Sequence, residues 1–280
     1  MPLYHLDAAP QLDAPVVVAA FDGWVDAGSA ATSVVEALAE DAETLVTFDS
    51  DQLFDYRSRR PTLEIRDGHL ESMEWPEVTL KIARYPGRDL LVLSGSEPDD
   101  RWRVFSEAVV DLARRLGVAG WISLGAIPAA VPHTRSVPIL GTESRPGLLM
   151  GGITPGPSGL LTVPAAALSM LEMSVAATGI PAVGYFAQIP HYVTGPYAIA
   201  AVELMRSLER HLGIDLPRRG LADEARQLRT KLDAATAADE GTRSYVERLE
   251  TMVDESRQPV GEDLISEIER YLRDRSGNGS

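Results

Sequence analysis

Polar residues that could carry out chemistry stand where apolar segments of this chain end. Asp22 and Asp26 follow the apolar run Val16–Phe21. Carboxylates at the end of a buried strand could hold a metal ion, bind a ribose or act as a general base. The alternative is turn chemistry, because aspartate also accepts hydrogen bonds from backbone N–H groups in turns and at helix starts.

The turn after this run contains Gly23, Gly28 and Ser29 and leads into a predicted helix over Gly28–Ala39. Unpaired backbone N–H groups at a helix start can bind an anion, so these three residues are candidate ligand contacts. No GxGxxG or P-loop pattern is present, and a tight turn by itself also explains the two glycines.

More candidates follow the next buried run. Ser94 and Glu97 stand at its end, with Asp99 and Asp100 directly behind them. The acidic groups could complement Asp22 in a metal site. Aspartate at this place also favours capping, so we expect Asp99 or Asp100 to cap the helix that follows.

The best single polar pair is His133 with Arg135, in a Pro-rich loop after the apolar run Gly120–Leu124. His191 follows the run Val183–Ile189 in the same way. A histidine beside an arginine could act as a general acid or base, or bind phosphate. The alternative for both histidines is a hydrogen-bonded surface group.

A basic cluster, Arg57, Arg59 and Arg60, stands out in an acidic chain. Arginine binds phosphate or carboxylate in a bidentate manner. The cluster could equally pair with acidic side chains, including those of a neighbouring subunit.

Composition bounds the classes of function. The 280 residues carry a formal net charge of −15, which argues against nucleic acid or an anionic membrane as a partner. The absence of cysteine excludes disulfides and thiolate nucleophiles. Ser158 lacks the GxSxG elbow of a nucleophile, and we predict neither a metal site nor a cofactor. No signal peptide or membrane-spanning run is evident, so we expect a cytoplasmic protein.

Alternating strand and helix signals must position these residues, and they predict an α/β fold with a mostly parallel sheet. The predicted strands are Val16–Phe21, Thr44–Phe48, Thr62–Arg66, Val78–Tyr85, Leu90–Ser94, Gly120–Leu124 and Val183–Ile189. Of these, we expect Thr62–Arg66 and Val78–Tyr85 to pair as antiparallel strands around a turn at Asp67-Gly68. The predicted helices are Gly28–Ala39, Asp100–Leu116, Pro164–Thr178 and Pro196–Leu212. Right-handed crossovers return parallel strands in the same sense, so Asp22, Ser94, Glu97 and His133 should share one pocket.

We divide the chain into an α/β domain at 1–216, a helical C-terminal extension at 217–275 and a disordered tail at 276–280. After Pro217 the composition becomes highly charged and without strand signals. Helices are predicted near Ala222–Ala238, Thr242–Asp254 and Asp263–Arg273. Their apolar stripe should cover the main domain or a neighbouring subunit.

Several segments together resemble the proteasome assembly chaperone 2 family in its actinobacterial branch. They are Phe21–Ala31, Phe54–Pro61, Leu124–Thr142, Gly151–Leu161 and Gly179–Val193. The resemblance implies a nucleoside-phosphorylase-like α/β fold with a helical C-terminal extension. It also implies an assembly chaperone of proteasome rings, although the group is catalogued as ATP-grasp-related too. Some relatives dock through a hydrophobic-Tyr-any C-terminus, which the ending Asn278-Gly279-Ser280 does not match.

Two hypotheses for function follow. The first is a non-catalytic, homo-oligomeric protein that assists assembly or binds a partner, with a trimer favoured by the resemblance. The second is an enzyme or binding protein for a nucleoside, nucleotide or similar small anion at the strand ends. The second hypothesis would be favoured if one pocket contained Asp22, Glu97, His133, Arg135 and His191. Scattering of these residues, together with an apolar surface patch, would favour the first.

Overall fold

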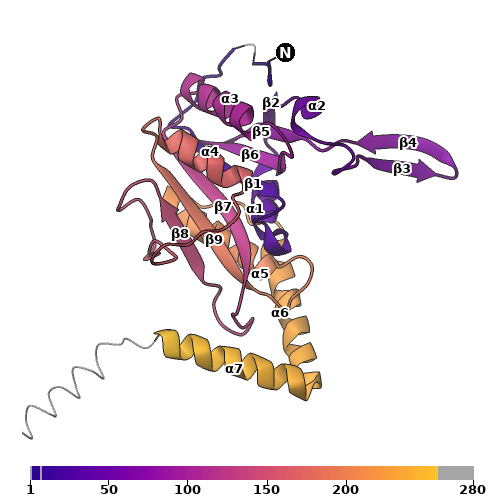
Figure 1. Ribbon diagram of the computed structural model, residues 1–280, viewed down its shortest axis with the longest axis vertical. Coiled ribbons are helices and arrows are strands. Elements are labelled where there is room, and N and C mark those ends of the chain that lie inside the picture. The colour runs from indigo at the N-terminus through magenta and orange to yellow at the C-terminus, as the bar shows by residue number, and fades with distance from the viewer. Residues whose placement is uncertain (1, 7, 258–280) are drawn as a thin grey trace, which may run out of the picture.

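The computed structural model describes residues 2–6 and 8–257 as one α/β molecule with two appendages. Its strands are β1 Val16–Asp22, β2 Glu43–Thr47, β3 Thr62–Arg66, β4 His69–Glu74, β5 Val78–Tyr85, β6 Arg88–Ser96, β7 Gly120–Ala129, β8 Ile139–Glu143 and β9 Ala182–Pro190. Its helices are α1 Ala30–Ala39, α2 Ser50–Leu53, α3 Trp102–Arg115, α4 Ala167–Ala176, α5 Ala198–Leu212, α6 Leu221–Ala238 and α7 Glu240–Arg257, with a 3-10 turn, η1, at Ala27–Ser29. Figure 1 shows the sheet in the body, the β3–β4 hairpin to one side and α7 below.

The main sheet has seven strands in the order β2-β5-β6-β1-β7-β9-β8. Its centre is parallel, because β1 pairs in parallel with both β6 and β7, and β7 pairs in parallel with β9. The outer strands β5 and β8 run antiparallel to β6 and β9, and β2 runs antiparallel to β5. The predicted mostly parallel α/β sheet is therefore confirmed, and β1, β2, β6, β7 and β9 all run in the same sense.

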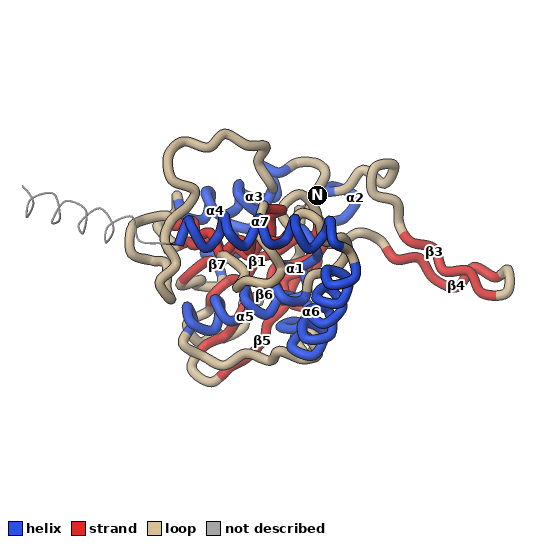
Figure 2. Tube along the Cα trace, turned by 90° about the horizontal axis from the view of Figure 1, so that it is seen from below, coloured by secondary structure: helices blue, strands red, loops and turns tan. Residues whose placement is uncertain are grey.

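Helices cover both faces of this sheet (Figure 2). Val18 and Ala20 of β1 lie in a buried cluster with α1 and α5. Val17 and Ala19 lie in a second cluster with α3 and α4, because successive strand residues point to opposite faces. A strand buried on both faces has no room for polar side chains, which explains the unbroken apolar run at the start of the chain.

The predicted pairing of Thr62–Arg66 with Val78–Tyr85 is wrong. The turn at Asp67-Gly68 is present, but it joins β3 to β4. The segment Val78–Tyr85 is β5, which lies in the main sheet between β2 and β6. The two hairpin strands are exposed throughout, whereas β5 is largely buried, so alternation of residue types did not separate the two environments.

Three short elements, α2, β4 and β8, were not predicted. Each has only a few residues, too few for a periodic pattern to emerge. The start of α3 also differs, because its first turn follows Arg101, with a left-handed φ of 56° and no side-chain cap. The backbone N–H groups of Asp99 and Asp100 both donate to the carbonyl of Leu53, which holds these residues away from a capping position. The prediction that one of them caps this helix is wrong.

The C-terminal extension contains two of its predicted helices, α6 and α7. Leu221 at the start of α6 belongs to the same buried cluster as Leu216, and Leu228 and Leu232 pack against that cluster. The extension therefore covers the main domain of its own chain. The third predicted helix, Asp263–Arg273, and the tail at 276–280 lie outside the described residues. In the described part of the chain, no helix combines the length and apolar character needed to cross a membrane.

Candidate functional site

The strand-end carboxylate Asp22 is held by hydrogen bonds within the chain. Its two oxygens accept from Nη1 of Arg59 at 2.9 and 3.1 Å. They also accept from the backbone N–H of Glu97 at 3.1 Å and from the hydroxyl of Ser96 at 3.2 Å. Of the predicted basic cluster, Arg59 thus forms an ion pair inside the chain, while the side chain of Arg57 is 90% exposed.

Glu97 joins two segments that are distant in sequence. Its Oε1 accepts from the backbone N–H of Ala167 at 2.7 Å, in the first turn of α4. Its Oε2 accepts from the backbone N–H of Trp24 at 3.3 Å. A Cβ at Gly23, where φ is +133°, would lie 2.7 Å from that same Oε2. Glu97 therefore caps α4 from another part of the chain, and Gly23 allows its close approach.

Asp26 caps α1. Its carboxylate accepts from the backbone N–H groups of Ala31 at 2.7 Å and Thr32 at 3.3 Å, and from the hydroxyl of Thr32. Burial raises the pKa of Asp26, and the bonds from Thr32 and Ala31 oppose that effect. These two amides, at the start of α1, are therefore occupied by a side chain of the same chain. The turn-chemistry alternative describes Asp26.

The next turn is shaped by packing. Gly28 has a φ of +62°, and a Cβ there would lie 2.8 Å from the Cβ of Tyr197. The backbone N–H of Tyr197 donates to the carbonyl of Gly28 at 2.8 Å. Ser29 is also left-handed, and its carbonyl accepts from the hydroxyl of Ser33 at 2.6 Å. Glycine is needed here because the start of α5 lies directly against the turn.

A cavity of about 690 Å³ lies beside these strand ends. Asp22, Ser29 and Ser94 line it, whereas Glu97 and His133 do not. The expected single pocket therefore contains only part of the predicted set. Its wall carries both signs of charge, from Lys81 and several carboxylates. In the described part of the chain, no group of three or more His, Asp and Glu side chains could hold a metal ion.

Strand length explains why His133 lies elsewhere. The parallel register of β1 with β7 runs from the pair Val16–Gly120 to the pair Ala19–Ser123, and the next bridge joins Asp26, beyond the end of β1, to Ala126. Strand β7 then continues to Ala129, about 10 Å further at roughly 3.3 Å per residue. The loops after β7 and β9 therefore leave the sheet well beyond the end of β1. The direction of the strands alone predicts at which edge of the sheet their loops emerge, but not how far each strand extends before its loop begins.

His133 is buried against α6. The hydroxyl of Tyr192 accepts from the backbone N–H of His133 and contacts its Nδ1, both at 2.7 Å. Nε2 lies 3.4 Å from Oδ1 of Asp233 without hydrogen-bond geometry. Arg229 donates to the carbonyls of His133 and Thr134. Burial and the Arg229 guanidinium lower the pKa of His133, against the opposing effect of Asp233.

Arg135 and His191 are held by α7. Arg135 contacts Glu250 at 3.0 Å and binds Asp254 through two bonds of 2.7 and 3.0 Å. Nδ1 of His191 lies 2.9 Å from the carbonyl oxygen of Ala129, and its Nε2 lies 2.8 Å from the hydroxyl of Tyr245. We call His133, Arg135, His191, Tyr192, Tyr245, Glu250 and Asp254 the α7 cluster.

The structure thus brings three predicted residues together, with Arg135 and His191 as contacts of α7 and His133 as a contact of α6. Sequence reasoning missed the two tyrosines and the two acidic residues of the α7 cluster. One sequence feature pointed to a binding face on this helix: Glu250 and Asp254 are four residues apart and therefore share one helix face. Their partner could not be named from that spacing, because Arg135 is remote in the chain.

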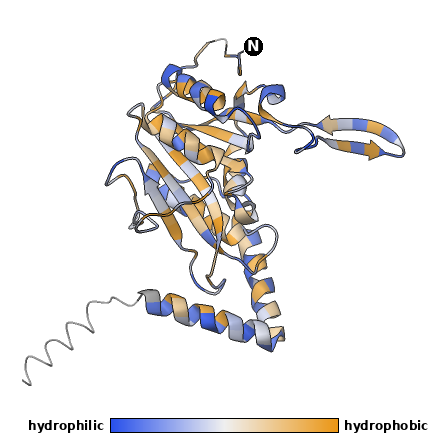
Figure 3. Cartoon of the chain, viewed as in Figure 1, coloured by the Kyte–Doolittle hydropathy of each residue, from blue (hydrophilic) through white to orange (hydrophobic). Residues whose placement is uncertain are grey.

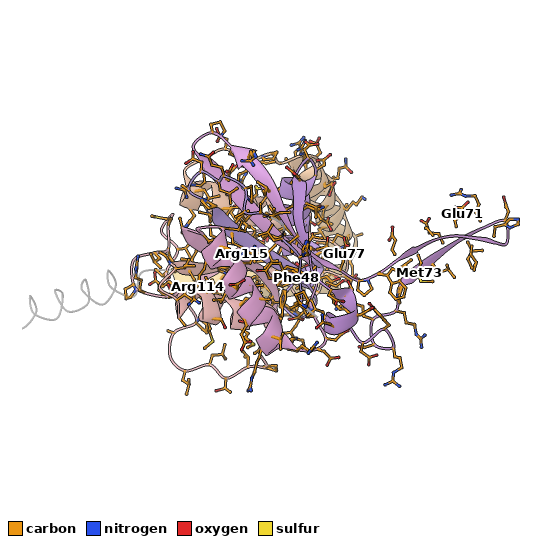
Figure 4. The ribbon with its side chains drawn as sticks, turned by 90° about the horizontal axis from the view of Figure 1, so that it is seen from above. Phe48, Glu71, Met73, Glu77, Arg114 and Arg115 are labelled. Carbon is orange, nitrogen blue, oxygen red and sulfur yellow. The ribbon has the colours of Figure 1, made fainter. Side chains whose placement is uncertain are left out.

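Sequence reasoning also missed the exposed apolar side chains, of which two segments carry several each. On the hairpin, Leu63, Ile65, Leu70 and Met73 are 41%, 60%, 72% and 49% exposed, and we call them the hairpin face. Between β8 and α4, Met150, Leu160, Leu161 and Val163 are 48%, 97%, 59% and 61% exposed, and we call them the loop patch. Figure 3 shows apolar segments alternating with polar ones along the hairpin. In Figure 4 its side chains, including the labelled Glu71 and Met73, project away from the body.

Comparison with known proteins identifies the family. The model of the PAC2 family matches residues 20–236, which is well over half of the chain. The chain belongs to the PAC2 family. This confirms the resemblance to proteasome assembly chaperones that the sequence segments suggested. No curated protein sequence matches this PAC2 chain.

Solved structures support the same conclusion. A Corynebacterium glutamicum protein of unknown function is 31% identical with a TM-score of 0.85, over 92% of this PAC2 chain and 99% of that chain. A proteasome-assembly chaperone homologue from Mycobacterium tuberculosis is 32% identical with a TM-score of 0.75, over 82% and 99%. The archaeal proteasome activator PbaB from Pyrococcus furiosus shares the fold, with a TM-score of 0.66 and 14% identity over 84% and 99%.

Proposed function

We propose that this PAC2 chain is a non-catalytic, assembly-chaperone-like protein that binds a protein partner and associates with copies of itself. Family membership and the 32% identical proteasome-assembly chaperone homologue support a chaperone-like role. A trimer in the cytoplasm is the expected form, and a subunit of the proteasome core particle is the first partner to test.

One observation carries this proposal: large apolar side chains face solvent, whereas bonds within the chain engage most of the polar candidates. The hairpin face and the loop patch expose large apolar groups of the kind that protein interfaces bury. The polar candidates divide into two separate groups, at Asp22 and at the α7 cluster, and intrachain bonds engage most of them. By the criterion set out from the sequence, this arrangement favours partner binding over a reaction at the strand ends.

Reconstitution tests the proposal. The purified chain is mixed with separately purified α- and β-type core-particle subunits of its source organism, and native mass spectrometry follows assembly with time. We expect a complex between the chain and a core subunit, and a faster appearance of assembled rings. Absence of any complex, together with an unchanged assembly rate, would contradict the proposal.

A thermal-shift series tests the non-catalytic part. Nucleosides, nucleotides and inorganic phosphate are titrated against the purified chain. We expect no saturable rise in melting temperature, because a ligand that binds the folded state stabilises it by mass action. A saturable rise that is lost in an Asp22→Asn variant would instead support a ligand site at the strand ends. Lys81→Ala, in the same cavity wall, serves as the second variant.

A further inference from the structure

The β3–β4 hairpin has an apolar face that no described residue of its own chain covers. β3 and β4 pair with each other and, among the described residues, with no other strand. Every residue of both strands is exposed. An isolated two-stranded hairpin is marginally stable in water, so an exposed one of this length favours a surface on which it can pack.

The register places the apolar side chains on one side of the hairpin. Leu63 lies opposite Met73 and Ile65 lies opposite Leu70, and directly opposed residues share a face. The other side is polar, and there the hydroxyl of Ser72 donates to Glu64 at 2.7 Å. The hairpin face is therefore continuous, and an extended partner segment could cover it from one side.

The hairpin is also acidic. The hairpin contains four carboxylates, on Glu64, Asp67, Glu71 and Glu74. Its one arginine is Arg66. Arg66 already pairs with Glu71 at 2.6 Å. A second hairpin would bring like charges together, which opposes a symmetric hairpin-to-hairpin contact.

The loop patch has the complementary character. Residues 144–164 contain no aspartate or glutamate and one arginine, Arg145, in a chain with a formal net charge of −15. Leu160 at 97% exposure and Val163 at 61% stand at the end of this segment. Glu143, just before this segment, already accepts from the backbone N–H groups of Leu148 and Leu149. This weakly charged apolar surface therefore accommodates an acidic apolar hairpin with little charge repulsion.

The two surfaces cannot meet within one chain. The hairpin leads into β5, beside the edge strand β2, whereas the loop patch follows β8, the strand at the opposite edge of the sheet. Figure 1 shows the hairpin pointing away from the body on the side opposite β8. A hairpin face that meets a loop patch must therefore belong to another copy.

We infer that the hairpin face of one copy packs on the loop patch of a second copy. This rests on the self-association in the proposed function and names the surfaces that would carry it. Because two different surfaces meet, the contact is heterologous and repeats from copy to copy until a ring closes. Each chain in such a ring contributes one hairpin and receives one.

Charge-insertion variants test both surfaces. We expect sedimentation velocity of the wild-type chain at micromolar concentration to show an oligomer. Leu70→Glu on the hairpin face and Leu160→Glu on the loop patch should each reduce the mass to the 30.3 kDa monomer. Val104→Glu, at a 40% exposed site on α3, is the matched control and should leave the oligomer intact. Circular dichroism should show unchanged folding for all three.

Mixing the two variants identifies the contact as heterologous. Leu70→Glu keeps its loop patch and Leu160→Glu keeps its hairpin face, so an equimolar mixture should form a complex of two chains and stop there. If the wild-type chain is a monomer, the self-association fails together with this inference. If the wild type is an oligomer that either variant leaves intact, only the inference is overturned. A mixture that stays monomeric also overturns it.

Discussion

Helix α7 and the β3–β4 hairpin both stand off the central sheet, yet of the two only α7 is covered by residues 2–6 and 8–257 of its own chain. Val246 and Leu249 of α7 are each 3% exposed, and Arg135 binds Glu250 and Asp254 across the contact. On the hairpin, Leu70 is 72% exposed. An appendage whose apolar side chains are buried contributes to the stability of its own fold, whereas one whose apolar side chains face water is suited to contact another molecule.

The same contrast appears in the polar groups. The α7 cluster joins residues more than a hundred positions apart, such as Arg135 with Glu250. The side-chain bonds of the hairpin, Arg66 with Glu71 and Ser72 with Glu64, remain within it. Loss of α7 should therefore affect the stability of the body, and loss of the hairpin should affect assembly only.

The largest expected effect is that of removing the C-terminal extension. Truncation after Leu216 deletes α6 and α7 and uncovers the cluster that Leu221, Leu228 and Leu232 pack against. Each buried leucine contributes about 1.5–3 kcal/mol, so we expect aggregation or an altered oligomer size and a much lower melting temperature. Size-exclusion chromatography and thermal melting measure both.

A second truncation, after Ala238, is the control for this prediction. It keeps α6 and removes α7, so the fall in melting temperature should be smaller. A chain cut after Leu216 that keeps its size and melting behaviour would remove the distinction between the two appendages.

The next effect concerns the docking of α7. Leu249→Ala should weaken it by about 2–5 kcal/mol, because a buried leucine is replaced and a cavity remains. Hydrogen exchange of the α7 amides measures the change. Met252→Ala on the same helix is the control, since Met252 is 58% exposed and its loss should change exchange by less than about 0.5 kcal/mol. Equal effects of the two substitutions would show that α7 is not held by its buried face.

A pH-dependent effect should also distinguish the two appendages. The pKa of His133 is lower in the folded protein than its ordinary value of 6.5, mainly because of burial. The stability that depends on neutral His133 is therefore fully present above about pH 6.5 and is lost as the pH falls through the folded pKa. Asp233 and Glu250, which face the ring, partly offset this loss, and Arg229 adds to it.

Thermal melting between pH 7.5 and 5 measures this loss. The wild type and both variants below are measured in the same buffers, none of which contains a carboxylate. His133→Asn should reduce the slope of stability against pH. His69→Gln on the hairpin is the control and should leave the slope unchanged. A slope that both variants share would locate the titrating group elsewhere.

The smallest effect on stability is expected for removal of the hairpin. Thr62 lies opposite Glu74 at its base, so residues 62–74 can be replaced by a short Gly-Ser-Gly turn. The free energy of unfolding, measured by urea denaturation at a concentration where the chain is monomeric, should change by less than about 0.5 kcal/mol. A destabilisation as large as that of the α7 truncation would mean that the hairpin supports its own body.

Much of the architecture follows from local patterns in the sequence. The unbroken apolar runs predict β1, β6, β7 and β9 as buried parallel strands, and their direction is right. The stop at Gly117, with a φ of +65°, and the amphipathic helices α5, α6 and α7 are equally local. Such features are predictable because neighbouring residues alone decide the periodicity of burial and the conformational freedom of a turn.

The roles of the polar residues were decided by the tertiary structure. Glu97 caps a helix whose Ala167 lies 70 positions away, and His133 is buried against α6. The place of β5 between β2 and β6 and the difference in reach between β1 and β7 also depend on the assembled sheet. The physical reason is common to all of them. A carboxylate or an imidazole has the same chemistry in a cap, an ion pair or an active site, and only the groups that folding brings within about 3 Å determine which of these it becomes.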